Sequence, residues 1–361
     1  MKFVNGLALE ITQRCNNECK YCFSSSNPSI TTEIPLNMLI SIVDQYITME
    51  NKIAYERWEN RRLESQIVIT GGEPFLHSEW KSFFSYLTDI DEQFDVASNG
   101  ILISEKDVVF LSETTIHDLQ ISLDGMREED NILRNPQKTK LIIDKIRMLA
   151  NSPLKSKLTV KATVSKYNVK HAQELIDFCK DIDVRLVFGY IQVLGRAALD
   201  TSYLLNSEEI KQFNRFIVEN NPHLVLPLMF SHVPCPLDID EEPLAFYISA
   251  EGDIYPCASF HESFFCIGNI YRDNLSQAIG GSRFKEIQNW VSERKEYMKS
   301  GPCKKCYVSD YCRGSCPAAS YYEMHSDRIP PIRICEGAKK FNFYMLPKLL
   351  QNNVKFPDRS R

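Results

Sequence analysis

The chain has 361 residues, of which 43% are hydrophobic, values typical of a soluble globular protein that can bury a sizeable core. Its formal net charge of -5 excludes the basic surface of a nucleic-acid-binding protein. The longest apolar runs, such as residues 224–230, are too short to span a bilayer, and the N-terminus lacks a signal peptide. We therefore expect a cytoplasmic protein with no nucleic-acid or membrane partner.

The first half of the chain alternates short apolar strands with amphipathic helices, which is the pattern of a parallel sheet. The predicted strands cover residues 6–12, 66–70, 94–99, 117–124, 158–165 and 184–191. The predicted helices between them include residues 35–62, 138–150 and 169–180. Six such units predict an α/β fold with an incomplete (β/α)6 TIM-like barrel. In such barrels the chemistry lies at the C-terminal ends of the strands.

The pattern changes after residue 200. A helix is predicted at residues 207–219, followed by a loop that contains Pro222 and Pro227. From Ser231 the chain is rich in cysteine, proline and turn residues, with few long periodic segments before a final helical run at residues 339–350. A small domain held together by metal has this composition. We therefore predict a barrel domain at residues 1–200, a linker with a helix at 201–230, and a metal-binding domain with a C-terminal helix at 231–361.

The 12 cysteines are unevenly distributed. In a reducing compartment they are not expected to form disulfides, and clustered thiols there indicate metal ligands or catalytic groups. Three lie within residues 15–22 and five within residues 303–335. The isolated Cys179 shares a helical spacing with Leu175 and Ile176, so we expect it to pack in the core.

The first cluster consists of Cys15, Cys19 and Cys22, on the loop that leaves the first strand. Thiolates are the usual ligands of [4Fe–4S] clusters, and three ligands would leave the fourth iron open, as in catalytic metal centres. The alternatives are half of a zinc site or three unrelated thiols. A zinc ion would require a nearby fourth ligand, and no histidine or cysteine follows until His77. The spacing therefore favours an open iron–sulfur cluster.

This C-x3-C-x2-C spacing, with the aromatic Tyr21 before the last cysteine, resembles the radical SAM superfamily. The resemblance implies that the amine and carboxylate of S-adenosylmethionine bind the open iron. An electron from an external reductant would then split the sulfonium, and the resulting 5′-deoxyadenosyl radical would abstract a hydrogen atom from the substrate. The protein binds, orients and excludes water around this cofactor chemistry.

Residues 71–74, which end the second predicted strand, match the GGEP motif of the same family. Gly71 and Gly72 would allow the backbone to approach a ligand closely. Their carbonyl groups, with the carboxylate of Glu73 ahead of Pro74, suit the ammonium group of S-adenosylmethionine. A Gly-Gly turn alone would be unremarkable, but its place after the cysteine loop supports the resemblance.

Further cofactor contacts are implied by the resemblance at later strand ends. Asn99 and Ser122 lie in segments similar to those that bind the ribose and methionine parts of the cofactor. Arg134 offers a planar fork for the methionyl carboxylate. Arg196, after the sixth strand, is similar to a Gly-Arg element of these proteins. The alternative for each residue is a turn or a solvated surface position.

The C-terminal cysteines follow an order similar to that of the SPASM domain, which carries auxiliary iron–sulfur clusters. A zinc ribbon is the alternative, because C-x2-C pairs also bind zinc. The resemblance implies two auxiliary clusters, and thus three [4Fe–4S] clusters in the chain. The outer cluster would be held by Cys303, Cys306, Cys312 and Cys335, and the inner one by Cys235, Cys257 and Cys316. The inner cluster would either keep an open iron or take Cys266 as its fourth ligand.

Proteins with a SPASM domain mostly act on peptides or proteins, and two branches compete. One branch matures ribosomally synthesised peptides (RiPPs) by forming crosslinks. The other is the anaerobic sulfatase maturase, which oxidises a cysteine or serine to formylglycine and places an aspartate directly after the cysteine of its Gly-x4-Cys segment. Here Ala258 follows Cys257. We therefore favour an oxidoreductase that crosslinks a peptide.

Peptide maturases often carry an N-terminal leader-binding domain. The barrel pattern here begins almost at residue 3, which leaves no room for one. We therefore expect leader recognition from a separate partner protein or from the barrel and SPASM surfaces. A non-catalytic iron–sulfur electron carrier is the alternative from another class, but such carriers usually complete their cluster ligation with protein. The sequence singles out no catalytic base.

Overall fold

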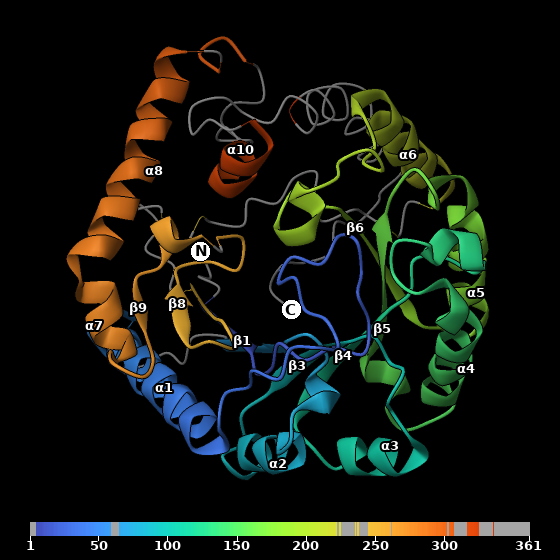
Figure 1. Cartoon of the computed structure of the whole chain (residues 1–361), viewed down its shortest axis with the longest axis horizontal. Coiled ribbons are helices and arrows are strands. Elements are labelled where there is room, and N and C mark those ends of the chain that lie inside the picture. The colour runs from blue at the N-terminus through green and yellow to red at the C-terminus, as the bar shows by residue number, and fades with distance from the viewer. Residues whose placement is uncertain are drawn as a thin grey trace.

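The computed structural model describes residues 5–58, 65–221, 224, 235, 237, 245–260, 262–301, 303–306, 316–324 and 335. Its frame is one curved sheet in which nine described strands have the order β6-β5-β4-β3-β2-β1-β7-β8-β9 (Figure 1). The six strands of the first half are parallel neighbours. They are β1 (Asn5–Glu10), β2 (Ser65–Thr70), β3 (Phe94–Ser98), β4 (Ile116–Ser122), β5 (Leu158–Val164) and β6 (Arg185–Tyr190).

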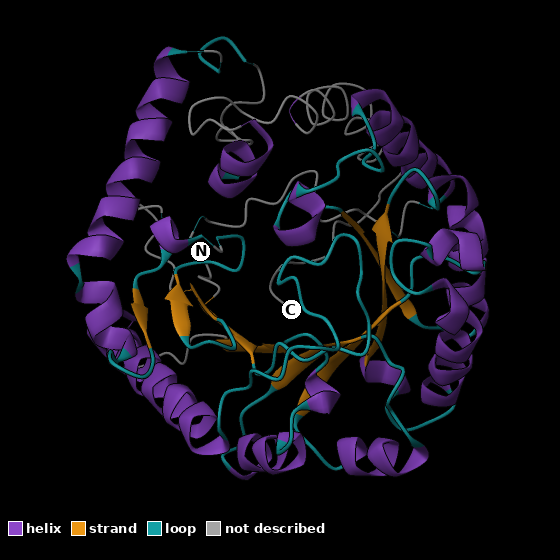
Figure 2. Cartoon of the chain, viewed as in Figure 1, coloured by secondary structure: helices purple, strands orange, loops and turns teal. Residues whose placement is uncertain are grey.

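The predicted partial barrel is confirmed, because each of these six strands overlaps a predicted one and none closes the sheet on itself. Helices lie around the outside of the curved sheet (Figure 2). The sequence predicts several of them to within a few residues, and the predicted final helix at 339–350 lies outside the described residues. The helices of the first half are α1 (Leu36–Trp58), α2 (Trp80–Asp89), α3 (Glu105–Ser112), α4 (Thr139–Ala150), α5 (Ala172–Asp181) and α6 (Ser207–Asn220).

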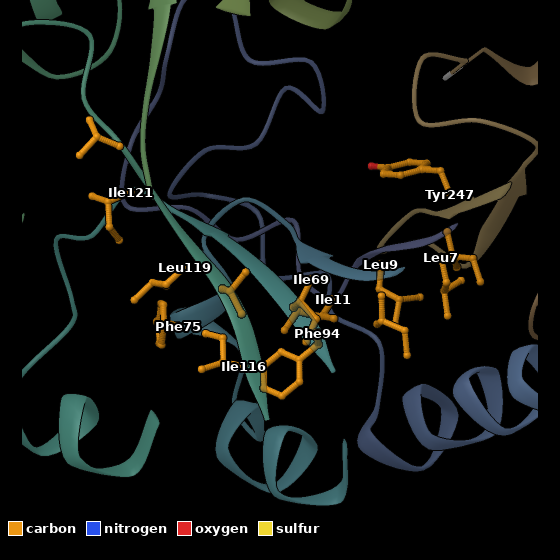
Figure 3. Close-up of a cluster of buried hydrophobic side chains, with 14 of the residues drawn as sticks. Leu7, Leu9, Ile11, Ile69, Phe75, Phe94, Ile116, Leu119, Ile121 and Tyr247 are labelled. Atoms are coloured by element: carbon orange, nitrogen blue, oxygen red, sulfur yellow. The ribbon is translucent and has the colours of Figure 1, made fainter. Parts of the chain in front are cut away.

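The hydrophobic core lies between the sheet and these helices. Alternate strand residues such as Leu9, Ile69 and Phe94 point toward the helices and are almost fully buried (Figure 3). Cys179 is buried in the same core, as its helical spacing predicts. Because neighbouring residues of a strand point to opposite faces, the residues between these hydrophobic ones point to the concave face.

The concave face is polar at the N-terminal end of the strands. The Asp95 carboxylate accepts a hydrogen bond from Gln66 Nε2 at 2.7 Å and lies 3.0 Å from His117 Nδ1. Next to it, Arg185 Nη2 lies 2.7 Å from Asp118 Oδ1. Among the described residues, the concave side is thus lined by paired polar groups near the N-terminal ends of the strands.

The second domain continues the barrel sheet. Strand β7 (Ala245–Ile248) pairs parallel with β1, and β8 (Asp253–Tyr255) and β9 (Gly268–Asn269) follow antiparallel. This part of the chain also contains α7 (Leu275–Gly280), the long α8 (Ser282–Ser300) and α10 (Pro317–Met324). No helix is predicted at residues 282–300 from the sequence, so α8 is an addition of the structure. Helix α8 is polar apart from a narrow buried stripe that includes Ile287, Val291 and Met298.

Glu10, the last residue of β1, joins the two domains. Its Oε2 atom accepts hydrogen bonds from Tyr247 Oη at 2.9 Å and from the Ala250 backbone nitrogen at 3.2 Å. Burial raises the pKa of Glu10 to about 7. The ring of Phe246 on β7 also packs edge-on against Tyr46 of α1, with 6.4 Å between centroids. The domains therefore share a strand, a buried polar contact and part of the core.

Among the described helices, none combines the length and apolar character that crossing a membrane would require.

Leu9→Ala tests the core of the barrel. Leu9 is fully buried on the central strand β1, so truncation removes apolar contacts and leaves a cavity. We expect a loss of about 2–5 kcal/mol in the free energy of unfolding, measured by urea denaturation. The matched control is Val109→Ala on α3, where the side chain is 61% exposed. That control should change stability by no more than about 0.5 kcal/mol.

Glu10→Gln tests the buried junction between the domains. Because the pKa of Glu10 rises from 4.5 to about 7 on folding, its protonated form stabilises the native state below pH 4.5, and this contribution is lost as the pH rises through about 7. The wild type should therefore lose stability relative to Glu10→Gln over that interval, as measured by urea unfolding at several pH values. Exposed Glu128→Gln should track the wild type throughout. A constant difference between wild type and Glu10→Gln would contradict this.

Candidate active site at the strand ends

The loop that carries the N-terminal cysteines, residues 11–34, folds back over the concave side of the sheet (Figure 1). Isolated bridges join Thr12 to Glu33 and Arg14 to Asn27. Within the loop, Gln13 Nε2 donates to the Ser24 carbonyl at 3.1 Å. These contacts close the loop on itself, so the cysteines sit on a fixed frame at the C-terminal ends of the strands.

Cys15 is buried, and Cys19 and Cys22 are half-buried. The Asn17 backbone nitrogen donates to Cys15 Sγ at 3.4 Å. Burial raises the pKa of Cys15 to about 12, with smaller contributions from Cys19 and Cys22, so the three thiols lie within electrostatic range of one another. Three thiols on one short loop fit one face of a [4Fe–4S] cluster. Because their raised pKa values keep Cys15 and Cys19 protonated at neutral pH, binding of a cluster would release protons.

Arg196 holds this loop from the side of β6. Its Nε donates to the Cys19 carbonyl at 2.7 Å and its Nη2 to the Ser26 carbonyl at 2.8 Å, while its backbone nitrogen donates to the Cys22 carbonyl at 3.0 Å. The preceding Gly195 has a positive φ of 54°, and a Cβ there would lie 2.2 Å from the Phe23 carbonyl oxygen. The structure thus places Arg196 on the backbone of the cysteine loop, and its contact with S-adenosylmethionine stays a prediction.

The turn after β2 packs against the same loop. The Gly72 nitrogen donates to the Thr12 carbonyl at 2.7 Å, and the Glu73 nitrogen to the Arg14 carbonyl at 2.9 Å. A Cβ on Gly71 would lie 2.6 Å from Thr12 O, and one on Gly72 would lie 2.3 Å from Arg14 O. Both glycines are therefore required for the turn and the cysteine loop to meet, whatever ligand they also approach.

The Glu73 side chain is fully buried and turns toward the end of β3. It accepts hydrogen bonds from Ser98 Oγ and from the Asn99 backbone nitrogen, each at 2.8 Å. Burial raises the pKa of Glu73 to about 7. Pro74 begins a short 3-10 helix, Pro74–Leu76. The carboxylate thus connects the second and third strand ends, and its contact with a bound ammonium group stays a prediction.

Two asparagines of the cysteine loop attach it to other strand ends. Asn99 Nδ2 donates to Asn16 Oδ1 at 2.7 Å. Asn135 Nδ2 donates to Asn17 Oδ1 at 2.8 Å, and Asn17 is 3% exposed. The structure therefore assigns Asn99 a supporting role for the loop, while its predicted contact with the cofactor ribose remains open to test.

Tyr21, Asp124 and Arg134 form a buried cluster beside Cys19. The Tyr21 hydroxyl donates a short hydrogen bond to Asp124. Arg134 Nε donates to Asp124 Oδ2 at 3.2 Å, and its guanidinium lies 5.3 Å from the centroid of the Tyr21 ring. Arg134 is therefore already hydrogen-bonded to one carboxylate, that of Asp124. The carboxylate of S-adenosylmethionine, its predicted ligand, would be a second one. Ser122, the half-buried last residue of β4, lies two residues before Asp124.

Contacts are described for several of the C-terminal cysteines. Burial and then the charge of Cys316 raise the pKa of Cys257 to about 11, so these two thiols lie within electrostatic range of each other. Cys266 Sγ instead donates to the Gly268 carbonyl at 3.2 Å. Cys303 and Cys306 share a turn in which the Cys306 nitrogen donates to the Cys303 carbonyl at 3.0 Å. Cys235 and Cys335 are half-buried, and Cys312 lies outside the described residues.

Sequence reasoning missed the parts of the site that act through other residues. Asp124 lies in a segment that the resemblance highlights, yet its role as the acceptor for Tyr21 and Arg134 appears only in the fold. Asn16 and Asn17 lie between cysteines and carry no signal of their own. A carboxylate at the last residue of the predicted strand 117–124 was the one hint available for Asp124.

Comparison with known proteins identifies the two parts of the chain. Residues 9–179 match the sequence model of the radical SAM superfamily, and residues 242–307 match that of SPASM, an iron–sulfur cluster-binding domain. The mycofactocin maturase MftC of Mycolicibacterium smegmatis is 24% identical over 88% of this chain and 79% of its own length. The PqqA peptide cyclase of Bradyrhizobium diazoefficiens is 23% identical over 87% of this chain and 81% of its own length.

Solved structures show the same fold. Native anSMEcpe with bound AdoMet and Cp18Cys peptide aligns with a TM-score of 0.70 at 19% identity, over 98% of this chain and 99% of that one. Streptococcus suis SuiB bound to its precursor peptide SuiA aligns with a TM-score of 0.66 at 17% identity, over 93% of this chain and 76% of that one. The thiols after β1 and the two sequence matches agree: residues 9–179 form a domain of the radical SAM superfamily, and residues 242–307 belong to a SPASM iron–sulfur cluster-binding domain.

Proposed function

We propose that this enzyme generates a 5′-deoxyadenosyl radical and uses it to modify a ribosomally synthesised peptide oxidatively, with a crosslink as the product. The observation that carries the proposal is the set of three convergent thiols after β1, held against the Gly71–Gly72 turn. Relatives named as a mycofactocin maturase and a PqqA peptide cyclase support a peptide as the substrate class.

We further propose the cofactor set. Cys15, Cys19 and Cys22 hold the catalytic [4Fe–4S] cluster. Two auxiliary [4Fe–4S] clusters are held by the C-terminal cysteines, the inner one by a group that includes Cys257 and Cys316, whose thiols lie within electrostatic range of each other. The partners are an external one-electron reductant, the peptide substrate and a separate leader-binding protein.

The residues of the chain then have distinct tasks. When bound, the cluster and S-adenosylmethionine supply a radical that abstracts a hydrogen atom from the substrate. Arg196, Asn99 and the glycine turn keep the cysteine loop in place, so the three thiols that would hold the cluster are positioned before it binds. The strand ends around the loop would bind and orient the cofactor.

The sulfatase-maturase activity is the second candidate. The likeness to anSMEcpe lies in the fold, at 19% identity. The residue after Cys257 is Ala258, which cannot act as the proposed base of that branch. The peptide maturase therefore remains the function that the chain supports best.

The direct test is anaerobic reconstitution with iron and sulfide, followed by incubation with S-adenosylmethionine and dithionite. We expect 5′-deoxyadenosine to form, because reductive cleavage requires only the N-terminal cluster. Replacing Cys15, Cys19 and Cys22 together by alanine should abolish this product and lower the iron content, while Cys179→Ala should leave both unchanged. An electron carrier would form no 5′-deoxyadenosine in the wild type.

The substrate class is tested by co-expression with the short peptide gene nearest to this gene. Mass spectrometry of the peptide should show the loss of two hydrogens, as expected for one oxidative crosslink. A gain of mass, or an unchanged peptide in the presence of active enzyme, would refute crosslinking while leaving radical formation intact.

Gly72→Ala tests the contact between the glycine turn and the cysteine loop. The added Cβ would lie 2.3 Å from the Arg14 carbonyl oxygen, so the loop must shift. We expect a loss of S-adenosylmethionine affinity of about tenfold or more, since misplaced ligands cost that much in geometry-dependent sites, measured by anaerobic equilibrium dialysis. Gly189→Ala is the matched control, because a Cβ there has nothing within 4 Å. Equal affinity in the two variants would show that the turn does not position the loop.

A further inference from the structure

Lys161 is a charged residue that none of the roles above uses. Its neighbours on β5, Val160 and Ala162, are fully buried against the helices. Because strand residues alternate between faces, Lys161 points to the concave side of the sheet. Thr159 confirms this direction, since its Oγ1 donates to the inward-facing Asp118 at 2.6 Å. In the register of the sheet Lys161 is level with Ser122, the last residue of β4.

Lys161 is exposed to solvent on this side of the sheet. Burial and then the positive charge of Arg134 lower the pKa of Lys161, while the negative charge of Asp118 opposes the shift. Lys161 therefore points into the curve of the sheet, within charge range of Arg134 and Asp118, and can be reached from solution.

Within the described part of the chain, Lys161 has no hydrogen bond or ion pair from its ammonium group. The nearby carboxylates are already engaged. Asp118 binds Thr159 at 2.6 Å and Arg185 at 2.7 Å. Asp124 binds Arg134 and Tyr21 and also accepts from the Thr163 nitrogen at 2.9 Å.

The two arginines of this part of the concave face have carboxylate partners, because Arg134 pairs with Asp124 and Arg185 with Asp118. Lys161 has no ion pair in the described part of the chain, and Arg134 lies within charge range of it. An ammonium group without an ion pair and beside a second cation can bind a ligand of opposite charge.

We propose that Lys161 anchors a carboxylate of the substrate inside the barrel, and this inference rests on the proposed function. A compact ammonium group without a competing partner binds a carboxylate as a point charge. S-adenosylmethionine also has a carboxylate, but the family resemblance assigns that carboxylate to the open iron and to Arg134. A peptide supplies the carboxylate from its C-terminus or from an acidic side chain.

The test uses the full-length protein, reconstituted anaerobically and saturated with S-adenosylmethionine. The probes are N-acetylglycylglycine, which has a free carboxylate, and its C-terminal amide, which does not. Lysines are acetylated with trace acetic anhydride, and mass spectrometry follows Lys161 together with Lys180, an exposed lysine on the outer helix α5, in the same sample. The carboxylate probe should protect Lys161 at a concentration about tenfold or more below that of the amide, and Lys180 should be unaffected by either.

Equal protection of Lys161 by the two probes, or none by either, would overturn the proposal. Lys161→Met and Lys161→Arg provide the second arm. Because Lys161 is exposed and has no ion pair in the described part of the chain, neither change should impair folding. Both variants should bind S-adenosylmethionine as the wild type does and form 5′-deoxyadenosine at the same rate without substrate. If Lys161→Met weakens S-adenosylmethionine binding about tenfold, the carboxylate belongs to the cofactor and the substrate assignment is wrong.

The failure of this inference is distinct from that of the proposed function. Absence of 5′-deoxyadenosine in the wild type would refute radical chemistry, whereas absence of carboxylate selectivity at Lys161 would refute only the anchor.

Discussion

The site depends on one constraint, which is the close backbone contact between the cysteine loop and the turn after β2. The Gly72 nitrogen reaches the Thr12 carbonyl, and the Glu73 nitrogen reaches the Arg14 carbonyl, across a gap that leaves no space for a Cβ. Backbone hydrogen bonds of this kind fix position without depending on a rotamer. The loop that carries three thiols is thereby placed at the end of β1 before any cofactor binds.

The side chains around the loop reinforce the same placement from other strands. Arg196 binds loop carbonyls from the end of β6, Asn99 binds Asn16 from β3, and Asn135 binds Asn17 from the segment after β4. Several residues that the resemblance assigns to cofactor binding thus have a second task, because they hold the element that holds the cluster. The positions of the three cysteine ligands are therefore fixed by contacts from the sheet, and not by the loop alone.

The sequence predicts the six barrel strands well, because each has an uninterrupted apolar face and is followed by a turn signal. It predicts the thiols because their spacing is specific. Helix α8 was missed because its buried stripe is narrow and many of its residues are charged. Ile287, Val291 and Met298 follow a helical period, but they are too few to stand out from the polar residues around them. The second task of Arg196 could not be predicted, since it depends on contacts with residues 170 or more positions away in sequence. Lys161 was visible as the middle residue of a Thr-Lys-Thr alternation, but its lack of a partner is a property of the fold.

Strand β1 connects these features. It pairs with β2 on one side and β7 on the other, and it leads directly into the cysteine loop. Glu10 at its end binds Tyr247 and Ala250 of the second domain, and the Phe23 ring of the cysteine loop packs edge-on against Tyr247, with 6.1 Å between centroids. The distance between the catalytic cluster and the SPASM domain is therefore set by strand pairing and buried contacts, rather than by a linker. The concave side of the sheet therefore continues from the barrel strands into the second domain, and Lys161 lies on the barrel part of it.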